Sequence, residues 1–274
     1  MLKFIPSFSC RKALPAAGFF GLALCLVPAL PPCAYADTVD IKYSVSLSVL
    51  PIGVAYLNGK INTDTYKVEA GVKLTGLASL LASAKAIATA TGTISASRSL
   101  PTTYATTAAN SKVSRTIRMA VSGGGVSALD INPPFDETPD RIPVTDAHKR
   151  NIIDPLGALL MPYTGDAINE SVCNRTLPVF DGGAMFDIAL SYSEMREVKV
   201  KGYEGPVAVC AARYTPIAGH RPERPATKFM AENRDIEVWL APVNATHVAL
   251  PYRISVKTMS GTAVVEASEF NITH

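Results

Sequence analysis

Three charged side chains framed by proline or glycine form the polar cluster with the clearest chemical potential in this sequence: Arg141, Asp154 and Asp181. Two carboxylates in one cleft can act as general acid and base, and an arginine beside them can orient an anionic group. The same residue types have structural roles, because aspartate caps helices and forms turns while arginine pairs with it. Since proline follows one aspartate and glycine the other, we favour the structural interpretation and keep a hydrolase using Asp154 or Asp181 as an alternative.

Only two of the five cysteines, Cys173 and Cys210, lie outside a predicted leader at residues 1–36. Two cysteines in an oxidising compartment usually form a disulfide. This one would close a loop of about 38 residues and stabilise the fold by roughly 4 kcal/mol on the chain-entropy model. The alternative is a free catalytic thiol, but the neighbouring residues supply no group that would activate it. We therefore predict a Cys173–Cys210 disulfide.

Compact enzyme motifs are lacking. The sequence has no nucleophile elbow, zinc-protease helix or phosphate-binding loop, and no Ser-x-x-Lys motif after the leader. Gly123–Gly125 superficially matches a dinucleotide-binding loop, but the prolines after Asn132 forbid the helix that such a loop requires, so we predict a hairpin turn. We expect no catalytic residue, no metal site and no cofactor, since the histidines are not spaced as metal ligands: His148, His220, His247 and His274.

Residues 1–36 have the three-part pattern of a cleavable export signal. Three basic residues precede or border an apolar run, Ala16–Leu30, and Ala34-Tyr35-Ala36 suits a signal peptidase. Prolines limit the run to about 15 residues, whereas a membrane span needs about 20, so a retained anchor is the weaker alternative. A lipid anchor on Cys25 or Cys33 is weaker still. We predict cleavage after Ala36 and no membrane-spanning segment in the remaining chain.

Charge and composition narrow the partner classes. The 274-residue chain has a formal charge of +3, and the leader contributes three basic residues and no acidic ones, so the remainder is formally neutral. Nucleic-acid-binding domains usually carry excess basic charge, so we expect no nucleic-acid partner. With 48% hydrophobic and 18% charged residues the chain can bury a core, and no repeat or linker divides it. We predict one β-rich domain over residues 37–274.

Alternating apolar and polar residues predict an antiparallel β protein, without the long helices that parallel strands require. Turn signals lie at Gly123–Gly125, Asp181–Gly183 and Ser260–Gly261, and Asn58-Gly59 predicts a turn or bulge. The strand patterns cover residues 41–49, 54–61, 66–74, 117–121, 236–240 and 252–256.

Two short helices are expected between the strands. One follows from helical spacing of apolar residues from Leu77 to Ala88, and the other would begin at Asp154-Pro155 and include the run Leu156–Met161. We expect leucines on these helices to line an apolar concavity: Leu77, Leu80, Leu81, Leu159 and Leu160.

Two irregular segments stand out. The proline-rich stretch Ile131–Ile153 is either a functional loop or a strap across the sheet. The basic segment Gly219–Pro225 is interpreted as a solvated loop, with contact to an anionic surface as the alternative.

Several short motifs follow one another along the chain in a characteristic order: Pro51-Ile52-Gly53, Gly76-Leu77, Arg141-Ile142-Pro143, Asp154-Pro155-Leu156, Cys173, Val179–Gly182, Phe186-Asp187, Cys210, Pro216–Gly219 and Ile236–Leu240. In this order the chain resembles the exported bacterial domain-of-unknown-function family 3108 across nearly all of residues 39–272. The resemblance implies a single, strongly curved antiparallel sheet, an open or half barrel, in the Gram-negative periplasm, similar to lipid-carrier and envelope-integrity proteins. It brings no catalytic residues. The sequence departs from the family pattern at Gly183-Ala184, where basic residues are expected, and at His220, where an aromatic residue is expected.

Three function classes follow. The first is a non-enzymatic periplasmic cell-envelope protein that binds lipid or lipoprotein on its concave face, or acts in envelope integrity. The second is an envelope scaffold that binds protein or peptidoglycan without a cavity. The third is the hydrolase that would use Asp154 or Asp181. A continuous apolar cavity would favour the first class, and a filled interior would favour the second.

Overall fold

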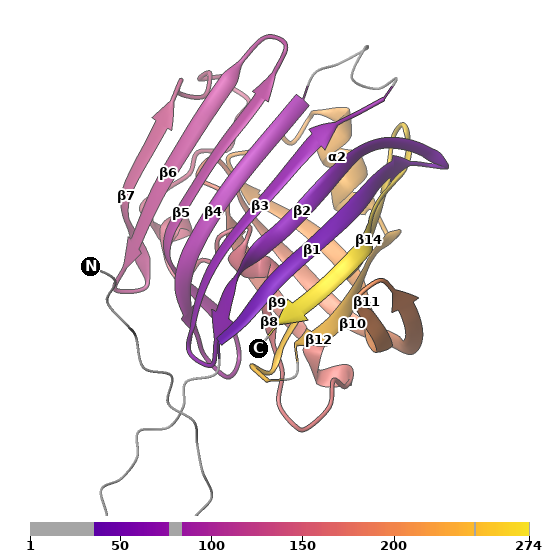
Figure 1. Ribbon diagram of the computed structural model, residues 1–274. Helices are drawn as coiled ribbons and strands as arrows, with labels where there is room; N and C mark the ends of the chain where they lie inside the picture. Colours follow the sequence, from indigo (N-terminus) through magenta and orange to yellow (C-terminus); the bar gives the residue numbers. More distant parts are fainter. Residues whose placement is uncertain (1–35, 77–83, 244, 274) are drawn as a thin grey trace, which may run out of the picture. The chain divides into compact units, whose positions relative to one another are not determined.

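The computed structural model describes residues 36–76, 84–243 and 245–273, within a compact unit that spans Ala34–His274. These residues form one antiparallel sheet of 14 strands, ordered β7-β6-β5-β4-β3-β2-β1-β14-β13-β12-β11-β10-β9, with β8 paired to β13 (Figure 1). The predicted single antiparallel sheet is therefore confirmed. The strands are β1 (Ala36–Leu47), β2 (Leu50–Asn62), β3 (Thr65–Leu74), β4 (Ala84–Ile94), β5 (Ser99–Asn110), β6 (Ser114–Ser122), β7 (Gly125–Asn132), β8 (Met161–Pro162), β9 (Arg175–Phe180), β10 (Met185–Val200), β11 (Tyr203–Ala218), β12 (Ile236–Val243), β13 (Val248–Thr258) and β14 (Gly261–Thr273).

Helical structure in the described residues is limited to one α-helix and three single 3₁₀ turns: α2 (Pro225–Glu232), η1 (Asp146–Lys149), η2 (Gly157–Leu159) and η3 (Glu170–Val172). Helix α2 directly follows the basic segment Gly219–Pro225, and Pro225 occupies its first turn, where the missing N–H costs nothing. The predicted loop is present from Gly219 to Arg224, and the helix that begins at the last residue of the segment was not predicted.

The helix expected from Leu77 to Ala88 is wrong where the structure describes it, since Ala84–Ala88 lie in β4. Alanine by itself favours a helix, and pairing with β3 and β5 on both sides overrides that preference. The three leucines of that prediction, Leu77, Leu80 and Leu81, lie outside the described residues.

The second expected helix is reduced to the single 3₁₀ turn η2, and Met161 already belongs to strand β8. The turn or bulge expected at Asn58-Gly59 is also wrong, because β2 continues through both residues in regular register with β1 and β3. Glycine is needed there for close packing, since a Cβ at Gly59 would collide with the backbone of Lys67. The turns at Gly123–Gly125, Asp181–Gly183 and Ser260–Gly261 are confirmed as strand connections.

Strand register aligns one inward-facing row across seven strands, from Ile41 through Leu57, Ala70, Ala88, Thr106 and Ile117 to Ile131. Figure 1 shows β10–β12 behind β1–β3, and one buried cluster draws side chains from both groups. The sheet therefore curves far enough to bury its inner face against itself. A second buried cluster, around Cys173 and Cys210, packs on the opposite face of β9–β13.

Of the two interpretations of the proline-rich segment Ile131–Ile153, the structure agrees with a strap. Its last residues, Arg150–Ile153, lie between the two edges of the sheet. At the β7 edge, the amide of Asn151 donates to the carbonyl of Gly124 at 2.6 Å. At the β9 edge, the amide of Ile153 donates to the carbonyl of Pro178 at 2.8 Å, and the carbonyl of Ile153 accepts from the amide of Phe180 at 3.0 Å. The strap thus links one end of each edge strand without the two edges pairing to one another, and it satisfies the backbone groups at those ends.

Candidate functional site

An apolar groove runs along the inner face of β1–β4. A cavity of about 220 Å³ lies over this face, and its walls include Tyr43, Ala55, Ala70 and Val72 from the sheet and Leu159 from η2. Small side chains repeat at the inward positions of β2–β4, so these strands leave space that larger residues would fill. Val72 faces inward and is nevertheless 41% exposed, which identifies an apolar position that the protein itself does not cover.

The groove continues toward the hairpin that joins the end of β5 to the start of β6. A second cavity of about 670 Å³ shares Val72 and Ala86 with the first, and is bordered further along by Ala108, Ile117 and Arg115. Its walls are mostly apolar, and the exceptions are Lys85 and Asn110 near strand ends, Arg115, and the carboxylate of Asp136. One continuous, mostly apolar channel therefore ends beside the guanidinium of Arg115 and the carboxylate of Asp136.

Arginines gather at that end of the groove. A third cavity of about 330 Å³ shares Arg115 and Phe135 with the second, and its walls also include Arg141, Arg221 and Arg224. Phe135 lies between two guanidinium groups, with its ring centre 4.2 Å from Cζ of Arg115 and 4.7 Å from Cζ of Arg141. These residues come from β6, the strap and the segment before α2, so only the tertiary fold brings them together.

Arg141 holds the strap to the turns that it crosses. Its Nε donates to the carbonyl of Gly219 at 2.9 Å and its Nη2 to that of Gly183 at 2.8 Å. A Cβ at Gly183 would lie 2.5 Å from Cε2 of Phe135. This explains one departure from the family pattern, because a basic side chain at this position would displace the aromatic ring.

The structure brings Arg141 and Asp181 to the same cavity but puts Asp154 elsewhere. Asp181 shapes the β9–β10 turn, accepting from the amides of Gly183 at 2.8 Å and Ala184 at 2.7 Å. Among the described residues, neither aspartate forms an ion pair with Arg141, contrary to the expected pairing.

Asp154 lies in a sealed polar cluster beneath the groove, with none of its surface exposed. Its Oδ1 accepts from the amides of Leu156 and Gly157, both at 2.9 Å, and its Oδ2 accepts from the hydroxyl of Tyr66 at 3.2 Å. Burial raises the pKa of Asp154 to about 6 against the opposing effect of these hydrogen bonds. Burial, and then the nearby carboxylate, raise the pKa of Tyr66. The expected helix N-cap at Asp154 is met only in part, because its carboxylate accepts from amides at the start of η2 while the N-cap residue of that turn is Leu156.

The two described leucines expected to line a concavity differ in position. Leu159 borders the groove, whereas Leu160 is buried in the core beside it. Sequence reasoning missed Arg115 and Phe135. The basic composition of Gly219–Pro225 pointed to Arg221 and Arg224 only as an exposed segment, and a lone aromatic among prolines was the available sign for Phe135.

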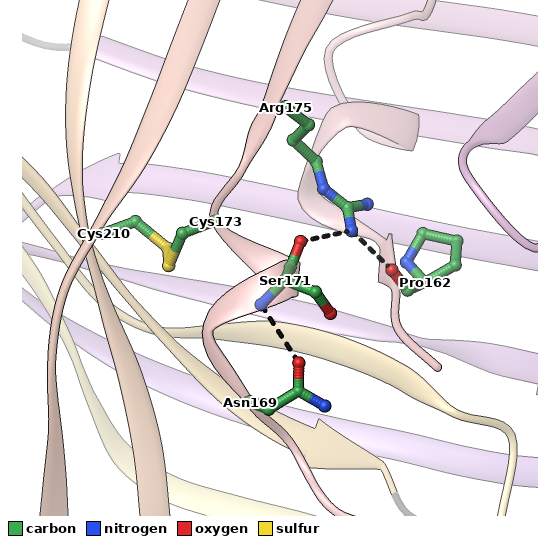
Figure 2. Close-up of a disulfide and its surroundings, with 6 residues drawn as sticks. All are labelled: Pro162, Asn169, Ser171, Cys173, Arg175 and Cys210. Carbon is green, nitrogen blue, oxygen red and sulfur yellow. Dashed lines mark hydrogen bonds between the residues drawn. A yellow bond between two sulfur atoms is a disulfide. The ribbon is translucent and has the colours of Figure 1, made fainter. Parts of the chain in front are cut away.

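The predicted disulfide is confirmed and lies away from the groove (Figure 2). It joins the residue after η3 to the middle of β11, with 5.4 Å between the Cα atoms. Asn169 caps η3 by accepting from the amide of Ser171 at 3.0 Å, and Arg175 donates to the carbonyl of Pro162 at 2.8 Å (Figure 2). The bridge therefore anchors a short helical turn to the sheet.

The described ranges, residues 36–76, 84–243 and 245–273, lack two features. No helix in them has both the length and the apolar character of a membrane span. No group of three or more histidine, cysteine, aspartate or glutamate residues in them is arranged to hold a metal ion.

Comparison with known proteins identifies a family and a fold. The model of the family described as "Protein of unknown function (DUF3108)" matches residues 42–268. A crystal structure of the beta-barrel-like protein of domain of unknown function DUF1849 from Brucella abortus is similar, with a TM-score of 0.53 and 8% sequence identity over 87% of this chain and 98% of that one. At this identity the likeness extends to the fold alone. No curated protein matches the chain.

Proposed function

Since the chain belongs to the DUF3108 family, whose description states no function, we propose from the geometry of the groove that it is a non-enzymatic binding protein of the bacterial cell envelope. In this proposal the groove holds the apolar part of an amphipathic molecule, a lipid or the acyl chain of a lipoprotein. The protein acts in the periplasm after loss of its leader.

One observation carries the proposal: the inner face of β2–β4 is apolar, concave and incompletely covered. A curved sheet normally buries its inner face against its own side chains, as β1 and β10–β14 do here. Over Ala55, Ala70 and Val72 an apolar space remains instead. Mostly apolar clefts with few polar groups are typical ligand sites in proteins.

The competing functions have less support. A scaffold without a cavity predicts a filled interior, which the groove at Val72 and Ala86 argues against. A hydrolase needs a nucleophile or base with access to substrate. Asp154 is buried from solvent, and one carboxylate oxygen of Asp181 accepts hydrogen bonds from two turn amides. Neither group is therefore well placed to act as nucleophile or base.

Native mass spectrometry of the protein purified from its own periplasm tests the proposal, because a bound lipid would add a discrete mass. The matched pair of variants is Ala88→Phe, which fills the inner face, and Thr89→Phe, which adds the same ring to the outer face of the same strand. We expect Ala88→Phe to lose the copurified lipid and Thr89→Phe to keep it, with both variants folded by circular dichroism.

The proposal fails if the purified protein carries no lipid and a delipidated sample binds no fluorescent fatty-acid analogue. It also fails if both phenylalanine variants retain lipid equally, since the ligand would then lie outside the groove.

A further inference from the structure

We propose that the arginines at the end of the groove bind the phosphate of the molecule whose apolar part lies in the groove, so that the ligand is a phosphate-bearing lipid. This inference rests on the function proposed above and adds the chemical class of the head group.

Charge at the groove end is the first support. The cavity there is bordered by four guanidinium groups and by two carboxylates, those of Asp136 and Asp181. Asp181 is engaged by turn amides, and a third carboxylate, Asp140, pairs with Arg221 at 2.7 Å. Four guanidinium groups against three carboxylates leave an excess of one positive charge at this point of a chain whose formal charge after the leader is zero.

Unused donors are the second support. Arg115 donates to the carbonyls of Pro133 at 2.8 Å and Pro134 at 3.1 Å, and Arg141 likewise donates to two carbonyls. Each guanidinium has five N–H groups, so these contacts fix its position and leave three donors over. Arg224 is exposed and donates no side-chain hydrogen bond to any other described residue. A site with positioned arginines and spare donors costs little reorganisation when an anion binds.

The start of α2 borders the same cavity through Thr227. The first bond within this helix runs from the amide of Lys228 to the carbonyl of Arg224 at 3.1 Å, so the amides of Ala226 and Thr227 precede it and have no acceptor within the helix. The helix N-terminus thus adds partial positive charge to that of the arginines.

Phosphate fits this donor set better than carboxylate. A carboxylate offers two oxygens, whereas a phosphate monoester offers three strong acceptors and up to two charges. Arginines from β6, the strap and the segment before α2 surround the cavity from different sides. An acceptor with several oxygens can satisfy more than one of them at once. An apolar channel leads to this cavity and could hold an acyl chain, which free phosphate lacks. We therefore assign the phosphate group to a lipid.

The test compares three probes on delipidated protein by isothermal titration: oleoyl lysophosphatidic acid, monooleoylglycerol with the same chain and no charge, and inorganic phosphate. We expect the phosphate-bearing lipid to bind about tenfold or more tightly than the neutral one, since hydrogen bonds to a charged group are each worth about that factor. Inorganic phosphate should bind far more weakly than either lipid.

The variant Arg221→Gln/Arg224→Gln should lose about tenfold in affinity for lysophosphatidic acid and leave monooleoylglycerol binding unchanged. Arg224→Gln alone is the second variant, because Arg224 is exposed and its removal leaves the fold intact. Arg118→Gln is the matched control, since it removes the same charge from the outer face of β6, where Arg118 forms only an exposed ion pair with Asp130. The control should bind both lipids like the wild type.

The outcomes separate the two proposals. If the neutral lipid binds and neither arginine variant weakens lysophosphatidic acid, the head-group assignment is overturned while the proposed function stands. If inorganic phosphate binds as tightly as the phosphate-bearing lipid, the site serves free phosphate and the inference is likewise overturned. If neither lipid binds the wild type, the proposed function itself fails.

Discussion

The hydroxyl of Tyr66 lies 3.2 Å from Oδ2 of Asp154, so strand β3, inside the sheet, holds a carboxylate 88 residues further along the chain. Gly157 makes this contact possible, because a Cβ there would lie 2.7 Å from the same carboxylate oxygen. The carbonyl of Gly157 accepts from Ser99 of β5 at 2.6 Å. This buried cluster joins the strap to two strands and supports the lower end of the groove at Leu159.

Asp154 should make stability depend on pH. Its pKa is about 6 in the folded protein and near the ordinary 3.8 when unfolded, so the folded state binds the proton more tightly. Stabilisation from protonation is complete below about pH 4 and is lost as pH rises through about 6, a change of roughly 3 kcal/mol. We expect the wild type to gain stability relative to Asp154→Asn when the pH falls from 7 to 5.

Urea unfolding of both proteins at a series of pH values measures this effect. The difference between the two proteins isolates Asp154 from other titrating groups. Parallel pH curves for wild type and Asp154→Asn would contradict the prediction.

Loss of the Cys173–Cys210 disulfide should destabilise the protein by about 2–4 kcal/mol, because the bridge restricts the unfolded chain and anchors η3 to β11. Chemical denaturation of the Cys173→Ala/Cys210→Ala variant measures the loss. Reductant should lower the unfolding midpoint of the wild type and leave that of the double variant unchanged. An unchanged wild-type midpoint under reductant would show that the bridge is dispensable.

Gly182→Ala and Gly123→Ala should differ although both residues have positive φ, +96° and +59°. A Cβ at Gly182 would lie 2.5 Å from Cγ2 of Ile117, whereas a Cβ at Gly123 would meet no atom within 4 Å. We expect a cost of about 1 kcal/mol at Gly123 from backbone strain, and roughly 2 kcal/mol or more at Gly182 from strain plus overpacking. Thermal unfolding of the two variants makes the comparison, and equal losses would argue that β9 does not close against β6.

Export predicts a mature protein that begins at Asp37. Intact-mass measurement of the protein in the periplasmic fraction should give the mass of residues 37–274 with two hydrogens fewer for the disulfide. A chain that retains Met1, or one that carries lipid on Cys33, would contradict both the cleavage site and the assignment to a free periplasmic protein.

Local patterns anticipated much of the sheet. Residues 41–47 and 66–74 alternate because each strand turns one face to the core, and that period is visible in any single strand. The strand predicted for residues 41–49 is two residues too long, because Ser48 and Val49 form the turn to β2 and Val49 is 91% exposed. The turn at Gly123–Gly125 could also be predicted, because glycine allows the backbone conformations of a turn. The disulfide could be predicted because only two cysteines lie outside the leader. The failure at Ala84–Ala88 has the opposite cause, since the helical preference of alanine is overridden by hydrogen bonding to β3 and β5, which are not local to this segment.

By itself, the sequence determined the β-rich fold class, the antiparallel strands and the disulfide, and the family resemblance added the single curved sheet. Only the tertiary structure decided that the inner alanines of β2–β4 leave a groove and that Arg115, Arg141 and Arg224 meet at its end. The physical reason is range. A strand, a cap or a turn depends on residues a few positions apart, whereas the groove and its arginines depend on sheet curvature and on a strap that joins edges formed by distant parts of the chain.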